Sequence, residues 1–352
     1  MSSCEQIKQD YQDLKTLKQE FDLEYQKAVE TGDLARAKEL RAELEQKRDA
    51  LADKLWPFER LPQKELKEQY ASQREILERT GILEQLSSGE MGIKGIDNEE
   101  YAFPSYQEIT QRMRESEEAL RPKTEQGFIR LQITPFGMKL DDLIEKYKQV
   151  ILKHHKEGKL LATKENPFDP DEQLELDENN PVWLWGNYRN ADVNDGEMVY
   201  YPKEFSSNHQ GKTKQEVLKE QGGWNILLAE NLPNIPRKNK GEEIKGRKQL
   251  EAGKTPYQYL ETLKTDPNYQ NETGMTPEDQ ITCAIIHLEQ TDQVIDDYRD
   301  SGKGSGSYQL GAYFSAGGFV PGFYWDRIGV GWPTWAGTFP RIPFLMLAPV
   351  AR

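Results

Sequence analysis

Apolar residues recur every three or four positions through two stretches at the start of the chain, residues 7–28 and 34–55. This spacing places them along one face of each of two helices. Between the stretches, Gly32 suits the end of one helix and Asp33 suits the cap of the next. The pattern therefore predicts an antiparallel helical hairpin over residues 1–58, which acts as a spacer or pairs with other copies.

The next segment continues with weaker helical patterning. A helix is predicted from 63 to 86, followed by a glycine-rich stretch at 88–97 and a short helix that Ser105 caps and that runs to about Leu120. We expect residues 59–126 to be a helical connector without chemistry of its own.

The pattern changes near Gly127, where residues 128–133 alternate between apolar and polar as in a strand. Apolar residues within 140–152 then form one face of a helix. A second helix is predicted over 276–298, because Thr276 can cap it and the following proline fits its first turn. Further strands are predicted at 182–185, 198–201, 224–228 and 345–350. These elements predict an α+β domain over residues 127–352.

Composition changes again at Leu310. From there to Arg352 the chain has no Lys, Glu, Gln, Asn or His, and only Asp326, Arg327, Arg341 and Arg352 are charged. Aromatic residues gather there among glycines and prolines: Tyr313, Phe314, Phe319, Phe323, Tyr324, Trp325, Trp332, Trp335, Phe339 and Phe344. Aromatic residues usually belong to cores, but this mixture is also typical of binding surfaces. Both interpretations stay open for each single residue.

Net charge and cysteine content narrow the class of protein. The formal charge is −14, and the residues after Gln309 hold three Arg and one Asp, so −16 belongs to the part before them. Nucleic-acid binding needs clustered Lys and Arg, so we expect no nucleic-acid partner. Cys4 and Cys283 cannot form a disulfide framework. Neither a signal-peptide stretch nor an apolar run of membrane length is present, so we expect a cytoplasmic or particle-associated protein without a membrane partner.

The sequence offers little for catalysis or metal binding. His154 and His155 are adjacent, so they point in different directions on a helix and cannot chelate one ion together. The acidic residues 169–178 lack the spacing of a calcium loop. No phosphate-binding loop, nucleophile elbow or dinucleotide fingerprint occurs. We therefore predict no enzyme activity, no cofactor and no metal site.

Three stretches near the end of the chain resemble a known family. They are YQLGAYF at 308–314, GFVPGFYWDR at 318–327 and LAPVAR at 347–352. They resemble the variable proteins of diversity-generating retroelements, in which a C-type lectin-like domain of the formylglycine-generating-enzyme branch ends the chain. The resemblance implies that the strand at 128–133 lies beside the final strand, with two helices flanking the sheet.

In that family a reverse transcriptase with adenine-specific errors rewrites chosen codons, typically AAC, near the 3′ end of the gene. Codons of the form NNC cannot encode Lys, Glu, Gln, Met or Trp, which agrees with the depletion after Leu310, provided that the Trp and Met residues there occupy fixed positions. The resemblance implies a hypervariable region at about 310–352, with Trp325, Trp332 and Arg327 as its framework. The predicted variable contacts are Phe323, Tyr324, Asp326, Ile328, Val330, Pro333, Thr334, Ala336, Thr338, Phe339, Ile342 and Phe344.

The resulting hypothesis is a monomeric binding protein whose ligand is another protein, although the helical hairpin could form oligomers. A structural protein of a viral or phage particle is the alternative, with the aromatic residues buried in an interface. An enzyme of the formylglycine-generating type is a third, and it would need reactive cysteines where only Cys283 is available.

Overall fold

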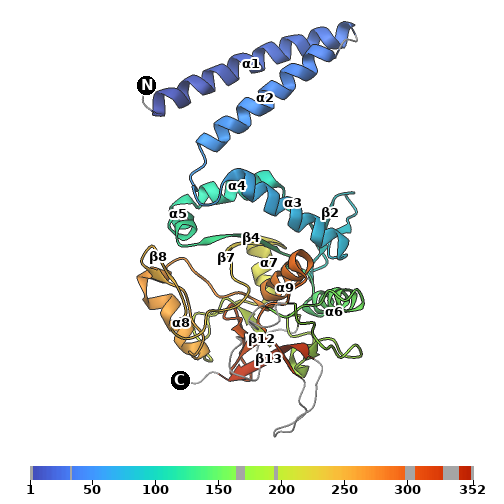
Figure 1. Cartoon of the computed structure of the whole chain (residues 1–352), viewed down its shortest axis with the longest axis vertical. Helices are drawn as coiled ribbons and strands as arrows, with labels where there is room; N and C mark the ends of the chain where they lie inside the picture. Colours follow the sequence, from blue (N-terminus) through green and yellow to red (C-terminus); the bar gives the residue numbers. More distant parts are fainter. Residues whose placement is uncertain are drawn as a thin grey trace. The chain divides into compact units, whose positions relative to one another are not determined.

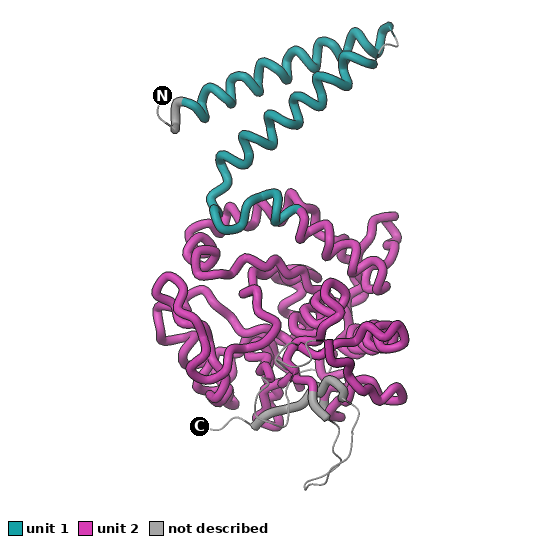
Figure 2. Tube along the Cα trace, in the orientation of Figure 1, with its two compact units in different colours: residues 1–67 teal, residues 68–352 magenta. Residues whose placement is uncertain are grey.

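The computed structural model is a mixed α+β protein (Figure 1). It describes residues 3–31, 34–163, 171–193, 197–297, 306–327 and 341–349. The chain divides into two compact units, residues 1–67 and 68–352, which Figure 2 distinguishes by colour. Residues 68–126 thus belong to the same compact unit as the residues that follow them.

The smaller unit confirms the predicted helical hairpin. Helices α1 (Ser3–Thr31) and α2 (Ala35–Lys54) pack against each other, and the Lys54 ammonium lies 2.6 Å from Asp10 Oδ2, so the end of α2 meets the start of α1. The buried residues between them are Leu17, Ala28, Ala37, Leu40 and Leu51. The predicted cap Asp33 lies outside the described residues, and the N-cap residue of α2 is Leu34, which makes no side-chain cap hydrogen bond.

The segment predicted as a helical connector contains a sheet as well as helices. Helix α3 (Gln63–Arg79) ends before the predicted residue 86, and Gly81 follows it with a φ of 69°. The glycine-rich stretch then pairs as an antiparallel sheet of β1 (Glu84–Gln85), β2 (Met91–Lys94) and β3 (Glu100–Ala102). Ser105 caps α4 (Tyr106–Glu115) as predicted, and α5 (Glu117–Glu125) follows.

Two helices cover the sheets in the centre of the larger unit. Helices α6 (Leu140–Lys156) and α9 (Pro277–Thr291) lie side by side, and α9 also contacts β4 (Phe128–Thr134) and β12 (Phe319–Arg327). The predicted apolar face of α6 is buried, with Leu143 and Ile151 both 0% exposed. Helix α9 ends earlier than predicted, because Asp292 adopts a left-handed conformation with a φ of 59°.

The largest of the described sheets contains the C-terminal strands. Its order is β5, β13, β12, β11, β6, with β10 also pairing with β12. These strands are β5 (Trp183–Leu184), β6 (Met198–Tyr200), β10 (Ser307–Tyr308), β11 (Ala312–Phe314) and β13 (Arg341–Pro349). All the pairings are antiparallel except that of β13 with β5.

One implication of the resemblance is not met by this register. The strand at 128–133 was expected beside the final strand, but β4 pairs with β7 (Asn225–Glu230) instead. The final strand β13 pairs with β12 and β5. The remaining short elements are η1 (Gly186–Tyr188), α7 (Lys214–Gln221), β8 (Glu243–Ile244), β9 (Arg247–Lys248), α8 (Pro256–Thr265) and η2 (Pro267–Tyr269).

A buried lysine lies where several of these elements meet. The Lys214 ammonium, at the start of α7, donates to Met138 O at 2.6 Å, Asp192 Oδ2 at 2.8 Å and Glu278 Oε1 at 2.9 Å. Tyr200 on β6 donates its hydroxyl to the same Glu278 oxygen at 2.7 Å. The side chains of Lys214, Asp192 and Glu278 are fully buried. We call these residues the Lys214 centre.

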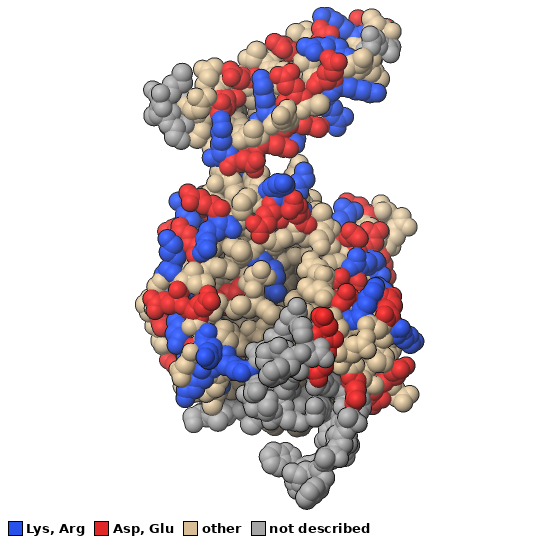
Figure 3. Space-filling view, in the orientation of Figure 1, with Lys and Arg blue, Asp and Glu red and all other residues tan. Residues whose placement is uncertain are grey.

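The surface of each unit mixes the two signs of charge. In Figure 3, acidic and basic side chains alternate over the face shown, without a broad patch of one sign. Within the part of the chain that the structure describes, no helix is long and apolar enough to span a bilayer.

Replacing Lys214 by Met should lower the free energy of unfolding by about 3–5 kcal/mol, because two buried carboxylates would lose their cation. Urea unfolding followed by tryptophan fluorescence measures this loss. The control is Lys219→Met, which removes an exposed ammonium from the same helix and should have little effect. Equal stability of the two variants would contradict the role assigned to the Lys214 centre.

Candidate functional site

Strands β12 and β13, with the residues between them, form what we call the C-terminal hairpin. Their ladder starts with the pair Phe319 and Pro349 and continues to the pair Arg327 and Arg341. Residues 328–340 lie outside the described residues. Trp332 falls there, together with seven of the predicted contacts: Ile328, Val330, Pro333, Thr334, Ala336, Thr338 and Phe339. These seven positions therefore all lie, along the chain, between two residues that are partners in the ladder.

Two aromatic residues of β12 belong to the core. Phe323 is 1% exposed and its ring lies 6.0 Å from that of Tyr147 on α6. Trp325 is 0% exposed, and its backbone N–H donates to Asp296 O at 2.7 Å. The position of Trp325 suits the framework residue that was expected there. Phe323 was expected among the variable contacts, and its burial instead makes it part of the core.

The other predicted contacts in the described strands share one register. Tyr324 pairs with Phe344, and Asp326 pairs with Ile342. Successive strand residues alternate between the two faces of a sheet, so these four positions belong to one face and the positions of Phe323 and Trp325 belong to the other. Tyr324 is partly exposed, whereas its neighbours on both sides are buried. The ladder thus separates packing positions from the remaining predicted contacts.

A cavity of about 370 Å³ lies elsewhere in the larger unit. Its described lining comes from α5, β4, β7, β9, α8, α9 and β10 and from loop residues, among them the segments 232–236 and 271–275. No local sequence pattern predicted this cavity, because its lining segments are far apart along the chain. None of the predicted variable contacts is among the described lining residues.

Two basic residues of the cavity wall are neutralised by glutamates. Arg247, which is 1% exposed, contacts Glu272 at 2.7 Å and Glu230 at 2.9 Å. Lys123 contacts the same Glu272 at 2.6 Å. The Arg247 guanidinium also lies 4.7 Å from the ring centre of Phe128, within the range of a cation–π contact. The charges of Lys123 and Arg247 are therefore balanced by those of Glu230 and Glu272.

A third basic residue, Arg130, has a different environment. Its Nη2 donates to Cys283 Sγ at 3.1 Å. Burial raises the pKa of the Cys283 thiol, although Arg130 opposes the shift. Burial and the Arg130 charge together lower the pKa of His287 to about 4. The thiol is therefore protonated and the imidazole neutral near neutral pH, and neither has the ionisation expected of a cysteine–histidine nucleophile pair.

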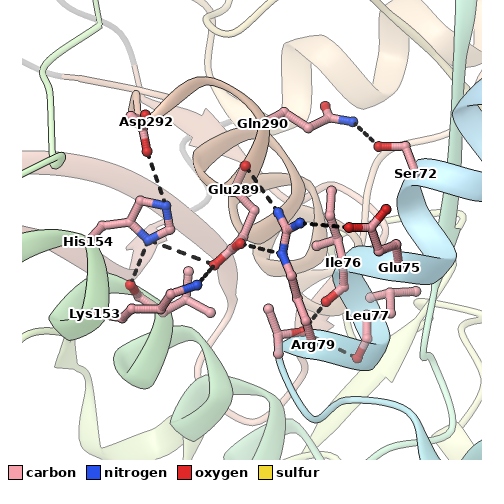
Figure 4. Close-up of polar contacts among 12 residues, drawn as sticks. Ser72, Glu75, Ile76, Leu77, Arg79, Lys153, His154, Glu289, Gln290 and Asp292 are labelled. Carbon is pink, nitrogen blue, oxygen red and sulfur yellow. Dashed lines mark hydrogen bonds and ion pairs between the residues drawn. The ribbon is translucent and has the colours of Figure 1, made fainter. Parts of the chain in front are cut away.

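Glu289 at the end of α9 joins three helices through residues of the larger unit (Figure 4). Its carboxylate accepts from Arg79 Nε of α3 at 2.7 Å and from Lys153 Nζ of α6 at 3.4 Å. His154 approaches it with Nδ1 at 3.8 Å, while Nε2 lies 3.4 Å from Asp292 Oδ1. These contacts hold the ends of the helices together, and they are explained by packing without any ligand.

The histidines show no metal-binding arrangement in the described ranges. His154 is 4% exposed, whereas the neighbouring His155 faces Glu178 at 3.4 Å, so the two rings point to different surroundings. Among the residues with described placement, no group of three or more His, Cys, Asp or Glu is positioned to hold an ion. Most of the acidic stretch 169–178 is described, and its first residues are not.

Comparison with protein-family models, with curated proteins and with solved structures finds no match to this chain. Interpretation of the site therefore depends on the residues and geometry of the chain itself. Two features of the larger unit are relevant, the C-terminal hairpin and the cavity.

Replacing Phe323 by Ala should lower the free energy of unfolding by about 3–5 kcal/mol, because a buried phenyl ring is lost and a void remains. Tyr324→Ala is the matched variant one position along the same strand, and its loss should be clearly smaller because the side chain is partly exposed. Chemical denaturation of both variants measures the difference. A larger loss for Tyr324→Ala would mean that the two faces of the ladder are assigned the wrong way round.

Stability should fall as the pH is lowered through the range set by His287. The pKa of His287 is about 4 in the folded chain against 6.5 for a free imidazole. Between about pH 6.5 and pH 4, the imidazole is therefore protonated in the unfolded chain and neutral in the folded chain. The contribution of the neutral His287 to the free energy of unfolding is complete above pH 6.5 and is lost as the pH falls towards 4. Thermal unfolding of the wild type and of His287→Gln across this range should show a flatter profile for the variant. Parallel profiles would show that His287 does not titrate in this way.

Proposed function

We propose that this chain is a binding protein without catalytic activity, and that its C-terminal hairpin presents variable side chains to another protein. The observation that carries the proposal is the composition after Leu310, where Lys, Glu, Gln and Asn, which are frequent earlier, are all missing. Codons of the form NNC would leave out Lys, Glu and Gln among these types.

The geometry of the hairpin supports this proposal, because some positions of β12 pack in the core and others belong to the opposite face of the ladder. Phe323 and Trp325 are buried and would remain constant, because changes there would disturb the core. Tyr324, Asp326, Ile342 and Phe344 occupy the other set of register positions. With Phe323 removed, the proposed variable contacts are these four residues and the seven between Arg327 and Arg341. A rigid scaffold under changeable side chains is the arrangement used by recognition proteins.

The finer fold proposed for residues 127–352 is a variant of the C-type lectin-like architecture. Its support is the pair of helices α6 and α9, which lie side by side, with α9 against both β4 and β12. The pairing of β4 with β7 departs from that architecture.

An assembly role for the smaller unit is the second candidate. Several large apolar residues of the helical hairpin are exposed, among them Leu23 at 59% and Val29 at 65%. Tyr11, Tyr25, Leu34 and Leu55 are also exposed. Exposed apolar residues on helices favour pairing with another protein or another copy. The enzyme alternative has less support, because the Cys283 thiol is buried and its pKa is raised.

Sequencing the 3′ end of this gene across a natural population tests the main proposal. Substitutions should concentrate at the codons for Tyr324, Asp326, Ile342 and Phe344 and for the predicted contacts between 328 and 340. The codons for Phe323 and Trp325 should stay constant, which is the internal control within one strand. Substitutions spread evenly over both sets of positions, or a uniform 3′ end, would overturn the proposal and favour an assembly role.

A further inference from the structure

The cavity described above has the size and lining of a small-molecule site. Its volume of about 370 Å³ falls within the range of roughly 300–1,000 Å³ that is usual for such sites. Apolar side chains dominate the lining, including Leu120, Phe128, Leu228, Leu232, Leu250 and Leu263. Several of them, such as Leu228 and Leu232, are only partly buried. On the face drawn in Figure 3, the larger unit is hollowed at a place where a basic side chain lies among uncharged atoms.

Among the described residues of the cavity wall, Arg130 is the cation that has no carboxylate partner. Lys123 and Arg247 are paired with Glu272 and Glu230. For Arg130, by contrast, no carboxylate of the described residues lies within ion-pair distance, and its hydrogen bond goes to the sulfur of Cys283, a weak acceptor. A guanidinium has five N–H donors in a planar fork that matches a carboxylate. Arg130 therefore retains donors at the wall of an apolar cavity.

We propose that this cavity binds a small organic carboxylate with an apolar body, and that Arg130 binds the carboxylate. The apolar body would occupy the space beside Leu228 and Leu232. The nearby Asp296 accepts from Gln280 Nε2 at 2.7 Å and also lines the cavity, as do Glu230 and Glu272. These acidic neighbours disfavour a ligand with several negative charges. A single carboxylate is therefore the chemistry that fits best.

This site is separate from the proposed contacts of the C-terminal hairpin. Ser307 and Tyr308 of β10 line the cavity, and in the ladder they pair with Phe323 and Gly322 of β12. The cavity thus shares a strand pairing with the hairpin but none of its proposed variable residues. Failure of one proposal leaves the other untouched.

Isothermal titration calorimetry of the full chain with decanoate, decanol and decylamine tests the inference. The wild type should bind decanoate at least about tenfold more tightly than decanol, because hydrogen bonds to a charged group are lost with the alcohol. Arg130→Met should remove this preference and keep the affinity for decanol. The control Arg74→Met changes an exposed arginine of α3 that does not line the cavity, and it should behave as the wild type.

A second variant covers the case in which Arg130→Met does not fold. Ala229→Phe places a ring in the cavity wall and should weaken the binding of decanoate and decanol together, with folding checked by circular dichroism. The proposal is overturned if the wild type binds no decanoate saturably, if decylamine binds more tightly than decanoate, or if folded Ala229→Phe binds decanoate as the wild type does. It is equally overturned if folded Arg130→Met retains the preference for decanoate.

Discussion

The larger unit depends on the burial of one charge, the ammonium of Lys214. Burial alone would lower the pKa of Lys214, but the carboxylates of Glu278 and Asp192 outweigh this effect and raise it, so the group stays charged. A buried charge is tolerated only when it is paired and hydrogen-bonded. The partners come from α9, from the segment after η1 and from the turn before α6. These segments must therefore meet at one point for the chain to fold.

The same centre positions the sheet that contains the C-terminal hairpin. Tyr200 donates its hydroxyl to Glu278, and its ring packs edge to face against Phe136 at 5.0 Å. Tyr200 lies on β6, which pairs with β11, and β11 pairs with β12. Strand β12 is also contacted by α6, where the ring of Tyr147 packs against that of Phe323. The buried face of β12 is thus held by contacts that do not involve Tyr324, which would allow variation at that position without loss of the fold.

Local patterns in the sequence predicted the helices well and the strand partners poorly. The face of α6 followed from apolar spacing, and the start of α9 followed from Thr276 and Pro277, whose effects act within one turn. The pairing of β4 with β7 joins residues about a hundred positions apart, so no local pattern could specify it. Lys214 is the first residue of a polar helix and has the sequence signature of a surface residue. Its burial follows only from carboxylates that the fold brings to it.

The predicted binding residues and the cavity illustrate two limits of sequence reasoning. Composition after Leu310 singled out a region, but it could not separate Phe323 from Tyr324, because burial alternates along a strand whose aromatic residues face both ways. The cavity has no compositional signature, since its lining comes from separate helices, strands and loops. Its wall nevertheless reaches the hairpin through β10. A ligand that binds only the folded cavity would stabilise that wall by mass action, and with it the strand on which the buried residues of the hairpin lie.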